Sequence, residues 1–437
     1  MLLEFKIGNY LSFKEISTFS LYPASIKEHK ETNIIESKTF SKIKFLKSAA
    51  IYGANASGKS NLFKAMAFMK FFVLNSSKET QAIDKIKVES YRLNFETYEN
   101  PSHFEISIVV NDIIYKYGFE ADKNEVKSEW LFSTSGVRQR KLFTRHNGKF
   151  NVAQFFPEGK GLENKTRSNA LFLSVVAQFN GSISGEIIKW FNNFNVISGS
   201  TDFRYWQFTA KMLDDEKMKN KIIEFIKLAD LGIEDIFVKT EEIPEEQQHI
   251  KISINNNGQI MPVKTGPKVS LNSIHKKYLN NQFDNKFEVF NFDSESEGTK
   301  KIFNLLGILL DTLNNDKILI IDELDSRLHP LLTREIVKLF HSDNNSSQLV
   351  FATHDTNLLD KNIFRRDQIW FTEKDIYGAT HLYSLAEYKL NNSKVRNDAS
   401  YEKDYILGYY GAIPYVSNFE SLFSILKDEK VNYGTME

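Results

Sequence analysis

The stretch IYGANASGKS, residues 51–60, holds the residue types that a phosphate-binding loop requires. Gly53 is followed by four residues and then by Gly58, Lys59 and Ser60, which is the spacing G-x-x-x-x-G-K-[ST]. In such a loop backbone amides converge on phosphate oxygens, the lysine reaches the β and γ phosphates, and the serine hydroxyl ligates Mg²⁺. The alternative is a plain glycine turn. The predicted nucleotide-binding residues are Gly53, Ala54, Asn55, Ala56, Ser57, Gly58, Lys59, Ser60 and Asn61.

Two adjacent carboxylates follow an apolar run in KILIIDELD, residues 317–325. Asp322 is placed to hold the shell of a Mg²⁺ ion together with Ser60, and Glu323 to polarise the water that attacks the γ phosphate. A solvated helix start would show the same two acidic residues. The sequence therefore predicts Ser60 and Asp322 as metal ligands and Glu323 as a catalytic residue.

A histidine ends the apolar run QLVFATH, residues 348–354. His354 is suited to hydrogen-bond a γ phosphate and to sense its presence, because its charge and tautomer respond to nearby groups. A strand-end histidine with a purely structural role is the alternative. We predict that His354 joins Lys59 and Glu323 in the catalytic set.

The segment SESEGTKKIF, residues 294–303, places Ser296 and Gly298 before an amphipathic stretch. The amides at the start of a helix, backed by a serine hydroxyl, form an anion site. An ordinary cap, in which Ser296 or Thr299 accepts from the first turn, explains the pattern equally well. The residues alone leave both interpretations open. Ser296 and Gly298 are called the signature pair below.

The elements that must position these residues alternate between strands and helices. Apolar runs at 46–53, 317–323 and 348–354 indicate buried strands, and helical spacing follows Ser60 and spans 298–315 and 330–340. Strands that alternate with helices imply a mainly parallel sheet, and such sheets bind ligands at the carboxyl ends of their strands. The candidate residues lie at such ends.

The remaining patterns divide the chain into three parts. Period-two alternation over 91–150 predicts an antiparallel β subdomain, helical spacing dominates 160–230, and NNNGQ at 255–259 indicates a hairpin tip. Sustained heptads are absent, so a long coiled-coil arm is not expected. We predict an N-terminal ATPase lobe over 1–150, a mostly helical insertion or arm over 151–290, and a C-terminal lobe over 291–437.

Composition narrows the functional classes. The 437 residues hold 56 Lys plus Arg and 56 Asp plus Glu, so no global field attracts nucleic acid or a membrane surface. The lack of cysteine excludes disulfides, thiolate metal sites and a cysteine nucleophile. No signal-peptide pattern or long apolar run occurs, so we expect a cytoplasmic protein without membrane contact. The basic segments VRQRK at 137–141 and Arg365–Arg366 could bind nucleic-acid phosphates or simply lie on a solvent-exposed face. Arg396 could form an ion pair within the chain or contact another subunit.

The motifs GANASGKSNL, SEGTKKIF, ILIIDELDSRLHP and VFATHD, in that order, resemble the ABC-type ATPase heads of the RecF, Rad50 and SMC group. They look most similar to the AAA15-like branch of OLD-like, abortive-infection AAA family ATPases, and the C-terminal YEKDYILGYYGAIP resembles a tail of that branch. The resemblance implies an α/β P-loop NTPase with an ABC-type head. Its sheet would be mainly parallel and flanked by helices, beside an antiparallel β subdomain and a mostly helical insertion. ATP and Mg²⁺ are the implied cofactors.

The resemblance also implies an oligomer. The signature pair would contact the γ phosphate of a partner subunit, so that ATP bridges two heads in a homodimer or higher homo-oligomer, with residues 325–329 near the interface. The chain departs from the transporter pattern, because the signature shrinks to Ser-Glu-Gly, His329 stands where an aspartate is usual, and no Q-loop glutamine is evident. These departures argue against a transporter subunit.

Relatives of this branch are often encoded beside a TOPRIM-type nuclease such as an RloB-like protein. We therefore expect an ATP-hydrolysing, dimerising switch in prokaryotic antiviral defence that controls a separate nuclease effector, since the chain shows no nuclease constellation of its own. The alternative is a RecF-like or SMC-like ATPase of DNA repair or maintenance that binds DNA directly. A nucleotide-binding scaffold without turnover is a third possibility.

Overall fold

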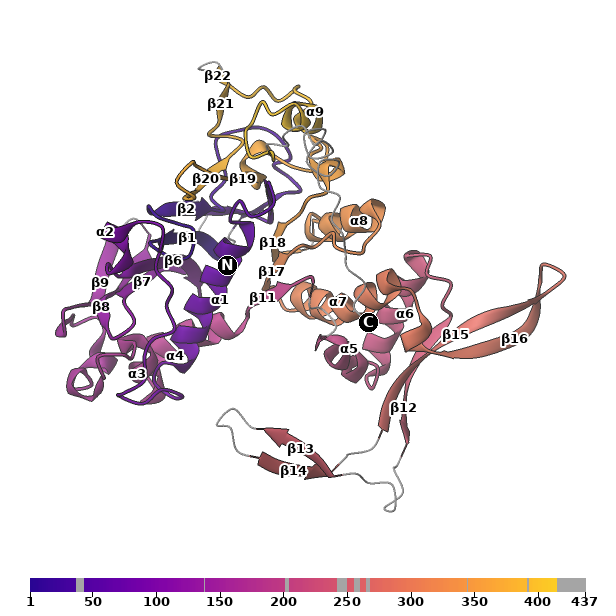
Figure 1. Cartoon of the computed structure of the whole chain (residues 1–437), viewed down its shortest axis with the longest axis horizontal. Helices are drawn as coiled ribbons and strands as arrows, with labels where there is room; N and C mark the ends of the chain where they lie inside the picture. The colour runs from indigo at the N-terminus through magenta and orange to yellow at the C-terminus, as the bar shows by residue number, and fades with distance from the viewer. Residues whose placement is uncertain are drawn as a thin grey trace, which may run out of the picture.

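The computed structural model describes residues 1–36, 43–136, 138–200, 204–241, 250–254, 260–264, 268–343, 345–390 and 393–414. Within these residues the chain forms a six-stranded sheet, a seven-stranded sheet and an arm of long antiparallel strands that projects away from both (Figure 1). The six-stranded sheet carries the candidate residues. It is called the central sheet below.

The central sheet has the strand order β11-β17-β18-β5-β19-β20. Its first five strands run parallel and only β20 is antiparallel to its neighbour. Strand β5 is buried along its whole length, and β18 likewise, because helices or the other sheet cover both faces. The strands are β5 (Ser48–Gly53), β11 (Phe194–Ser198), β17 (Ile318–Asp322), β18 (Gln348–Ala352), β19 (Ile369–Lys374) and β20 (Thr380–Ser384). The predicted α/β P-loop fold with a mainly parallel sheet is confirmed.

Helices that pack on the central sheet include α1 (Lys59–Asn75), α7 (Glu297–Asn314) and α8 (Pro330–Phe340). The apolar residues of α1 recur at helical spacing and are buried, as the sequence predicts: Leu62, Phe63, Met66, Met69 and Val73. They belong to one core cluster together with strands of both large sheets, so α1 lies between the sheets (Figure 1). This packing fixes the start of α1, where the phosphate loop ends.

The seven-stranded sheet is antiparallel throughout, with the order β10-β9-β8-β7-β6-β1-β2. Asn111 and Asp112 have φ of 46° and 61°, the left-handed conformation that a two-residue hairpin turn requires. The antiparallel subdomain expected over 91–150 is therefore present, and β1 and β2 extend it. The strands are β1 (Leu2–Gly8), β2 (Ser17–Ser20), β6 (Ser102–Val110), β7 (Ile113–Ala121), β8 (Val126–Ser135), β9 (Arg138–His146) and β10 (Lys149–Val152).

Residues 151–290 contain helices and also strands that helical spacing did not indicate. The helices are α3 (Phe172–Gln178), α4 (Ser182–Asn192), α5 (Trp206–Met212) and α6 (Glu216–Leu228). After α4 the chain supplies β11 to the central sheet, and after α6 it forms the arm: β12 (Asp235–Glu241), β15 (Lys268–Leu279) and β16 (Gln282–Asn291).

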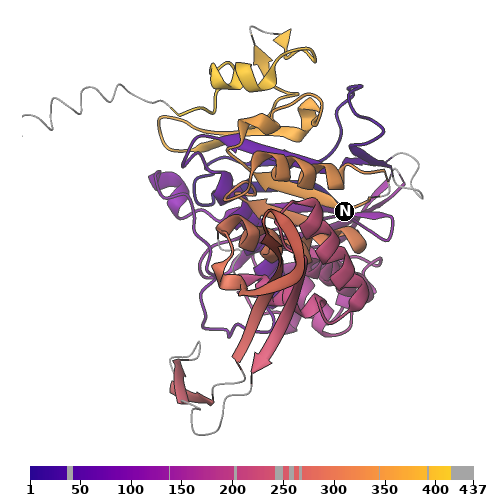
Figure 2. The ribbon, with the colours of Figure 1, turned by 90° about the vertical axis from the view of Figure 1, so that its right-hand side faces the viewer.

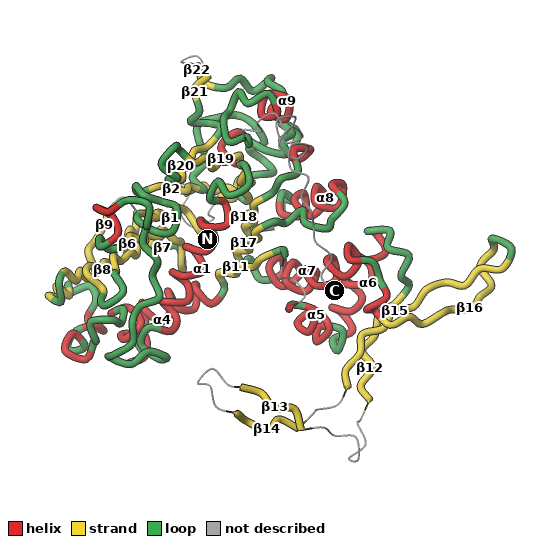
Figure 3. Tube along the Cα trace, viewed as in Figure 1, coloured by secondary structure: helices red, strands yellow, loops and turns green. Residues whose placement is uncertain are grey.

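The arm is a hairpin whose signal in the sequence is weak. Asn280 and Asn281 have φ of 50° and 63° and turn β15 into β16, but the strands carry charged residues on both sides of the alternation. Strands β13 (Ile250–Ile254) and β14 (Ile260–Lys264) pair antiparallel, and the predicted NNNGQ tip between them lies outside the described residues. The segment around α9 (Tyr401–Ile406) lies at the top of both views, and the arm lies below it (Figures 1 and 2). Figure 3 shows the strands of the arm in yellow.

Smaller elements complete the described chain. They are α2 (Phe95–Tyr98), β3 (Ile34–Glu36), β4 (Lys44–Leu46), β21 (Lys389–Leu390), β22 (Ser393–Lys394) and the short 3₁₀ helices at Pro157–Gly159, Glu163–Lys165, Phe292–Ser294, Thr356–Leu358 and Arg366–Gln368. No helix in the described part of the chain is both long and apolar enough to span a membrane.

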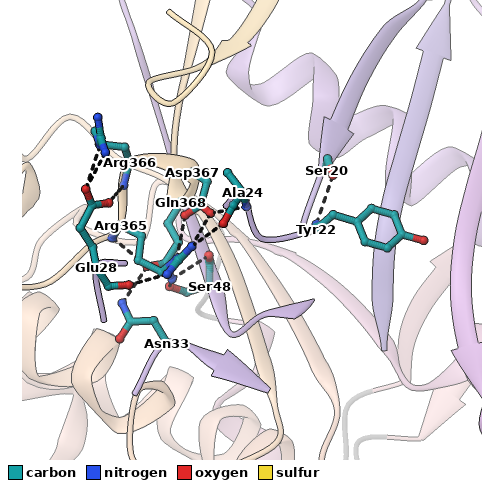
Figure 4. A network of polar contacts seen from close by, with 10 residues as sticks. All are labelled: Ser20, Tyr22, Ala24, Glu28, Asn33, Ser48, Arg365, Arg366, Asp367 and Gln368. Carbon is teal, nitrogen blue, oxygen red and sulfur yellow. Dashed lines mark hydrogen bonds and ion pairs between the residues drawn. The ribbon is translucent and has the colours of Figure 1, made fainter. Parts of the chain in front are cut away.

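Arg365 and Arg366 are neither a solvated face nor open to a nucleic acid. Arg365 is fully buried and forms a bidentate pair with Asp367, at 2.9 Å from Nε to Oδ1 and 2.7 Å from Nη2 to Oδ2 (Figure 4). Arg366 pairs with Glu28, Nη2 to Oε1 2.8 Å. Both interpretations of this dipeptide from the sequence are therefore wrong.

The other two basic features differ from each other. Arg138, Arg140 and Lys141 are exposed at the start of β9, and Val137 lies outside the described residues. Arg396 pairs with Asp398 at the surface, Nη2 to Oδ2 2.6 Å, which favours the structural pair over a contact to another subunit.

Candidate active site

The carboxyl ends of three neighbouring strands meet at one edge of the central sheet. Strand β5 ends at Gly53, β17 at Asp322, and β18 two residues before His354. Because β18 lies between β17 and β5 in the same parallel register, the residues that follow the three strands gather in one place. The predicted phosphate loop, carboxylates and histidine are thus brought together.

The phosphate loop is packed closely against β19 and β20. Gly58 has φ of 116°, and a Cβ there would lie 2.3 Å from Oγ1 of Thr380. A Cβ at Gly53 would lie 2.5 Å from the backbone oxygen of Thr372. Glycine is therefore required at both positions. The Thr380 hydroxyl donates to the carbonyl oxygen of Ser57 at 2.8 Å, and the Ser57 and Thr372 hydroxyls are 2.6 Å apart.

Thr372 and Thr380 are site residues that sequence reasoning missed. They lie on β19 and β20, far along the chain from the loop, and no local motif marks them. Asn61 extends the same contacts. Its side-chain amide donates to the Ser12 hydroxyl at 2.7 Å, and the Ser12 and Thr380 hydroxyls are 2.7 Å apart. Ala54 and Ser60 are half-buried, while Asn55 and Ala56 are exposed at the tip of the loop.

The Lys59 side chain is buried beneath the loop. Its ammonium donates to the carbonyl oxygens of Gly53 at 2.8 Å and Ala54 at 3.0 Å. Burial lowers the pKa of Lys59 to about 8, against the opposing attraction of Asp322 and two further carboxylates, Asp325 and Glu323. An anion bound in the loop would favour the charged ammonium.

Two carboxylate oxygens in this cluster are buried without a partner. Oδ1 of Asp322 and Oδ1 of Asp325 accept no hydrogen bond from any described residue. Burying a carboxylate oxygen without a partner costs free energy unless another group binds it, and a cation is suited to do so. The described residues contain no group of three or more His, Cys, Asp or Glu that could hold a metal by themselves. The donor set therefore fits a Mg²⁺ ion that takes one or two protein ligands and completes its shell with phosphate and water.

Glu323 has an unusual backbone. Its φ of 57° lies in the left-handed region, which a non-glycine residue adopts at a cost of about 1 kcal/mol or more. The conformation is held from both sides, because the carbonyl oxygen of Asp322 accepts from the Gly199 amide at 2.6 Å and the Leu324 amide donates to the Ala352 carbonyl at 3.1 Å. Backbone strain of this kind clusters at functional sites.

His354 lies against the carboxylates and Lys59. Its backbone amide donates to Oδ2 of Asp325 at 3.2 Å. Burial lowers the pKa of His354, and the charge of Lys59 lowers it further, against the opposing effect of Asp325. The neutral imidazole is thus favoured. Asp325, which the sequence placed only near a subunit interface, belongs to this cluster within the same chain.

The signature pair lies at the start of α7. Ser296 is the N-cap of the helix, and its hydroxyl accepts from the Thr299 amide at 3.1 Å. A Cβ at Gly298 would be 3.1 Å from the carbonyl oxygen of Arg327, and Glu297 pairs with Arg327 at 3.1 Å. In the described part of the chain neither residue of the pair hydrogen-bonds to the phosphate loop. The cap is therefore present, and a contact to a second subunit stays a prediction.

His329 also serves as a cap. Its Nδ1 accepts from the Leu331 amide at 3.2 Å, at the start of α8. The position where an aspartate is usual thus carries a residue that stabilises a helix end.

The chain is similar to one family of proteins and to solved structures of SMC heads. Residues 48–360 match the family model described as "AAA domain, putative AbiEii toxin, Type IV TA system". No curated protein matches the chain. Two similar solved structures are an SMC head bound to the C-winged helix domain of ScpA and the SMC head domain from Thermotoga maritima. The first has 13% identity, TM-score 0.42, and covers 88% of this chain and 97% of its own. The second has 11% identity, TM-score 0.37, and covers 88% and 98%.

Proposed function

This chain belongs to the AAA-domain family whose model spans residues 48–360, and from that premise we propose that it binds Mg·ATP at the phosphate loop and hydrolyses it. The observation that carries the proposal is the gathering of Lys59, Asp322, Glu323 and His354 at one sheet edge, with a carboxylate oxygen of Asp322 buried and unpartnered. Each of these groups has a role in phosphoryl transfer.

In the proposed reaction Lys59 leaves the carbonyl oxygens of Gly53 and Ala54 and pairs with the β and γ phosphates. The amides at the start of α1 bind the same oxygens, since the helix aims its positive end at the loop. Ser60 and Asp322 would hold Mg²⁺, which neutralises the charge that develops on the phosphate oxygens.

Glu323 would accept a hydrogen bond from the attacking water and orient it in line with the γ phosphate. Its left-handed backbone ends the extended conformation of the preceding strand. His354, favoured in the neutral form, would donate one ring N–H to a γ-phosphate oxygen. Binding and hydrolysis would therefore change the contacts of both residues.

We further propose that ATP joins two copies of the chain. Ser296 and Gly298 have no hydrogen bond to their own phosphate loop, and the neighbouring Glu297 is largely exposed, so the start of α7 is available to a second subunit. ATP bound between two heads would stabilise the dimer, and hydrolysis would release it, which is a population shift driven by contacts to the γ phosphate.

The biological role that we propose is defence against viruses, in which head engagement controls a separate nuclease effector. Support comes from the family description, which names a toxin of a toxin–antitoxin system, and from the abortive-infection resemblance of the motifs. The proposed effector is a TOPRIM or RloB-like nuclease encoded nearby.

A second candidate, a DNA-binding ATPase of repair or maintenance, has one observation in its favour. Arg138, Arg140 and Lys141 are exposed together on β9, and the Arg140 guanidinium lies 5.1 Å from the ring of the exposed Phe155. A filter-binding titration with duplex DNA at two salt concentrations separates the candidates. Tight binding with a steep salt slope favours the second, and weak binding favours the switch.

The central test measures Mg·ATP binding, hydrolysis and oligomeric state on the same preparation. We expect ATP turnover that requires Mg²⁺ and a rise in molecular mass by light scattering when ATP is added. Lys59→Ala should abolish both, because the phosphates lose their cation. Equal turnover or equal association in Lys59→Ala would contradict the proposal.

A further inference from the structure

A short C-terminal helix lies against the proposed nucleotide site. Helix α9 and the turn that follows it, residues 400–412, are called the C-terminal hook below. The hook packs into the core cluster that contains Tyr52 and Phe371 of the central sheet. No role follows from the sequence motif that covers it. Its contacts, however, reach two of the segments that would handle ATP.

The first contact is made by Tyr405, which is buried beside the start of the phosphate loop. Its ring stacks on Phe371 at 5.4 Å and meets the edge of Tyr52 at 5.8 Å. Its hydroxyl donates to the carbonyl oxygen of Ala412 at 3.1 Å. Burial raises the pKa of Tyr405 to about 12, so the hydroxyl keeps its proton.

Tyr52 is the residue before Gly53, and the carbonyl oxygen of Gly53 accepts from Lys59 at 2.8 Å. The Tyr405 ring therefore packs on the residue that leads into the phosphate loop.

The second contact is made by Glu402, one turn earlier on α9. Its carboxylate accepts from the Thr356 hydroxyl at 3.0 Å. Thr356 opens the short 3₁₀ helix that begins two residues after His354. Tyr52 supports the same segment, because its hydroxyl donates to the carbonyl oxygen of Asp355 at 3.2 Å. The hook is therefore bonded to the segment that carries His354.

Hydrogen bonds and close packing hold the hook together and fix it to the central sheet. Tyr410 is fully buried, its hydroxyl donates to Asp404 at 2.9 Å, and its carbonyl oxygen accepts from the Tyr383 hydroxyl at 2.8 Å. Gly411 has φ of 67°, and a Cβ there would lie 2.8 Å from the carboxylate of Glu373. These contacts hold Tyr405 and Glu402 in one fixed relation to each other.

We propose that the C-terminal hook is a positioning element of the nucleotide site, in which Tyr405 supports the start of the phosphate loop by packing on Tyr52 and Glu402 holds the His354 segment through Thr356. The inference rests on the proposed ATPase function. Neither residue touches the reacting atoms, so both act through others. Because the two contacts reach different parts of the site, their loss should affect different kinetic constants.

The test compares Tyr405→Leu and Thr356→Val with the wild-type chain. Tyr405→Leu removes the ring that packs on Tyr52 and keeps an apolar side chain, so we expect the Kd of a fluorescent ATP analogue to rise by about threefold to tenfold with little change in kcat. Thr356→Val keeps the shape and removes the donor, so we expect kcat to fall by about threefold to tenfold with little change in Kd. Tyr409→Leu is the matched control, because Tyr409 lies exposed on the same turn.

A purely structural role would lower the melting temperature of each variant without dividing the effects between Kd and kcat. Such a result, or values for Tyr405→Leu equal to those of Tyr409→Leu, would overturn the inference while leaving the ATPase intact. Lys59→Ala serves as the reference for lost binding. A wild-type chain that binds no ATP analogue would contradict the proposed function and, with it, the role of the hook.

Discussion

Lys301 donates its ammonium to the carbonyl oxygen of Gly199 across 2.5 Å, although it lies on α7 and Gly199 follows β11. Lys301 is almost fully buried, and a Cβ at Gly199 would lie 2.3 Å from the carbonyl oxygen of Glu323. The Gly199 amide donates to the carbonyl oxygen of Asp322 at 2.6 Å. Hydrogen bonds through Gly199 therefore connect α7, which begins at the signature pair, to the backbone of Asp322 and Glu323.

The first prediction concerns Lys301→Met, which keeps the length of the side chain and removes its charge. Gly199 loses a charge-assisted hydrogen bond, so the backbone of Asp322 and Glu323 becomes less restrained. We expect kcat for ATP to fall by about tenfold while Kd changes by less than about twofold, since the phosphate loop is untouched. Stopped-flow binding and steady-state turnover measure the two constants. Lys338→Met on the exposed side of α8 is the control, and an equal effect there would contradict this connection.

The second prediction concerns Glu323→Gln, which removes the base and keeps the shape. We expect turnover to fall by about 10²-fold to 10⁴-fold, because the attacking water loses its hydrogen-bond acceptor, with ATP binding preserved. A nucleotide-bound dimer should then accumulate, which light scattering detects. Glu335→Gln on the exposed face of α8 should change neither property. Unchanged turnover in Glu323→Gln would instead favour a nucleotide-binding scaffold.

The third prediction is a loss of ATP affinity at alkaline pH. Burial lowers the pKa of Lys59 to about 8 in the free chain, whereas bound phosphates favour the protonated ammonium and raise that pKa. Affinity should therefore be constant below about pH 8 and fall by up to about tenfold per pH unit above it, with a proton taken up on binding. Titrations between pH 7 and 9.5 and calorimetry in two buffers measure both effects. Affinity that stays flat across this range would show that Lys59 keeps its charge.

The fourth prediction concerns Gly58→Ala. The left-handed φ of 116° and the clash with Thr380 both oppose a side chain. We expect stability to fall by about 1–3 kcal/mol and ATP affinity to fall more than about tenfold. Thr380→Ala relieves only the clash, so the double variant should lose less stability than the sum of the two singles. Gly185→Ala is the control, because nothing lies within 4 Å of its Cβ position and helix α4 should gain about 0.5–1 kcal/mol. Additive losses in the double variant would argue against the clash.

The sequence predicted those parts of the site that depend on local spacing. The glycines of the phosphate loop, the carboxylates after β17 and the histidine after β18 each follow an apolar run, and parallel pairing of β5, β17 and β18 brings them together. Thr372, Thr380 and Tyr405 were not predicted, because they reach the loop only through tertiary packing. The connection through Gly199 was missed for the same reason.

The arm shows the limit of periodicity. Strands β15 and β16 carry the ion pair of Lys277 and Glu288, and aromatic residues such as Phe283 and Phe287 are exposed. Neither face of the hairpin therefore has the continuous apolar pattern of a strand that packs on a core. Asn280 and Asn281 have the left-handed φ of a hairpin turn, but the strands on either side lack the alternation that would mark a hairpin in the sequence. Arg365 shows the reverse case, in which a charged dipeptide that resembles a surface patch is buried.

The fifth prediction concerns that buried arginine. Arg365 and Asp367 form a bidentate pair whose side chains are 0% and 6% exposed, and the Arg365 guanidinium also binds the backbone of Ala24 and Glu28. Arg365→Met would leave the Asp367 carboxylate buried with only the Ala24 amide as a donor. We expect the free energy of unfolding in urea to fall by about 3–5 kcal/mol and residues 24–28 to become open to proteolysis.

Arg396→Met is the matched control, because Arg396 and Asp398 form a similar pair with side chains 81% and 57% exposed. Its loss should lower the free energy of unfolding far less than the loss of Arg365 does, since water screens and replaces the exposed pair. Equal losses in the two variants would show that burial does not decide the strength of the Arg365 pair. Because Arg365 joins the segment at residues 24–28 to the chain just before β19, its variant should also weaken the packing of β19 against β5, and hydrogen exchange along β5 would report that change.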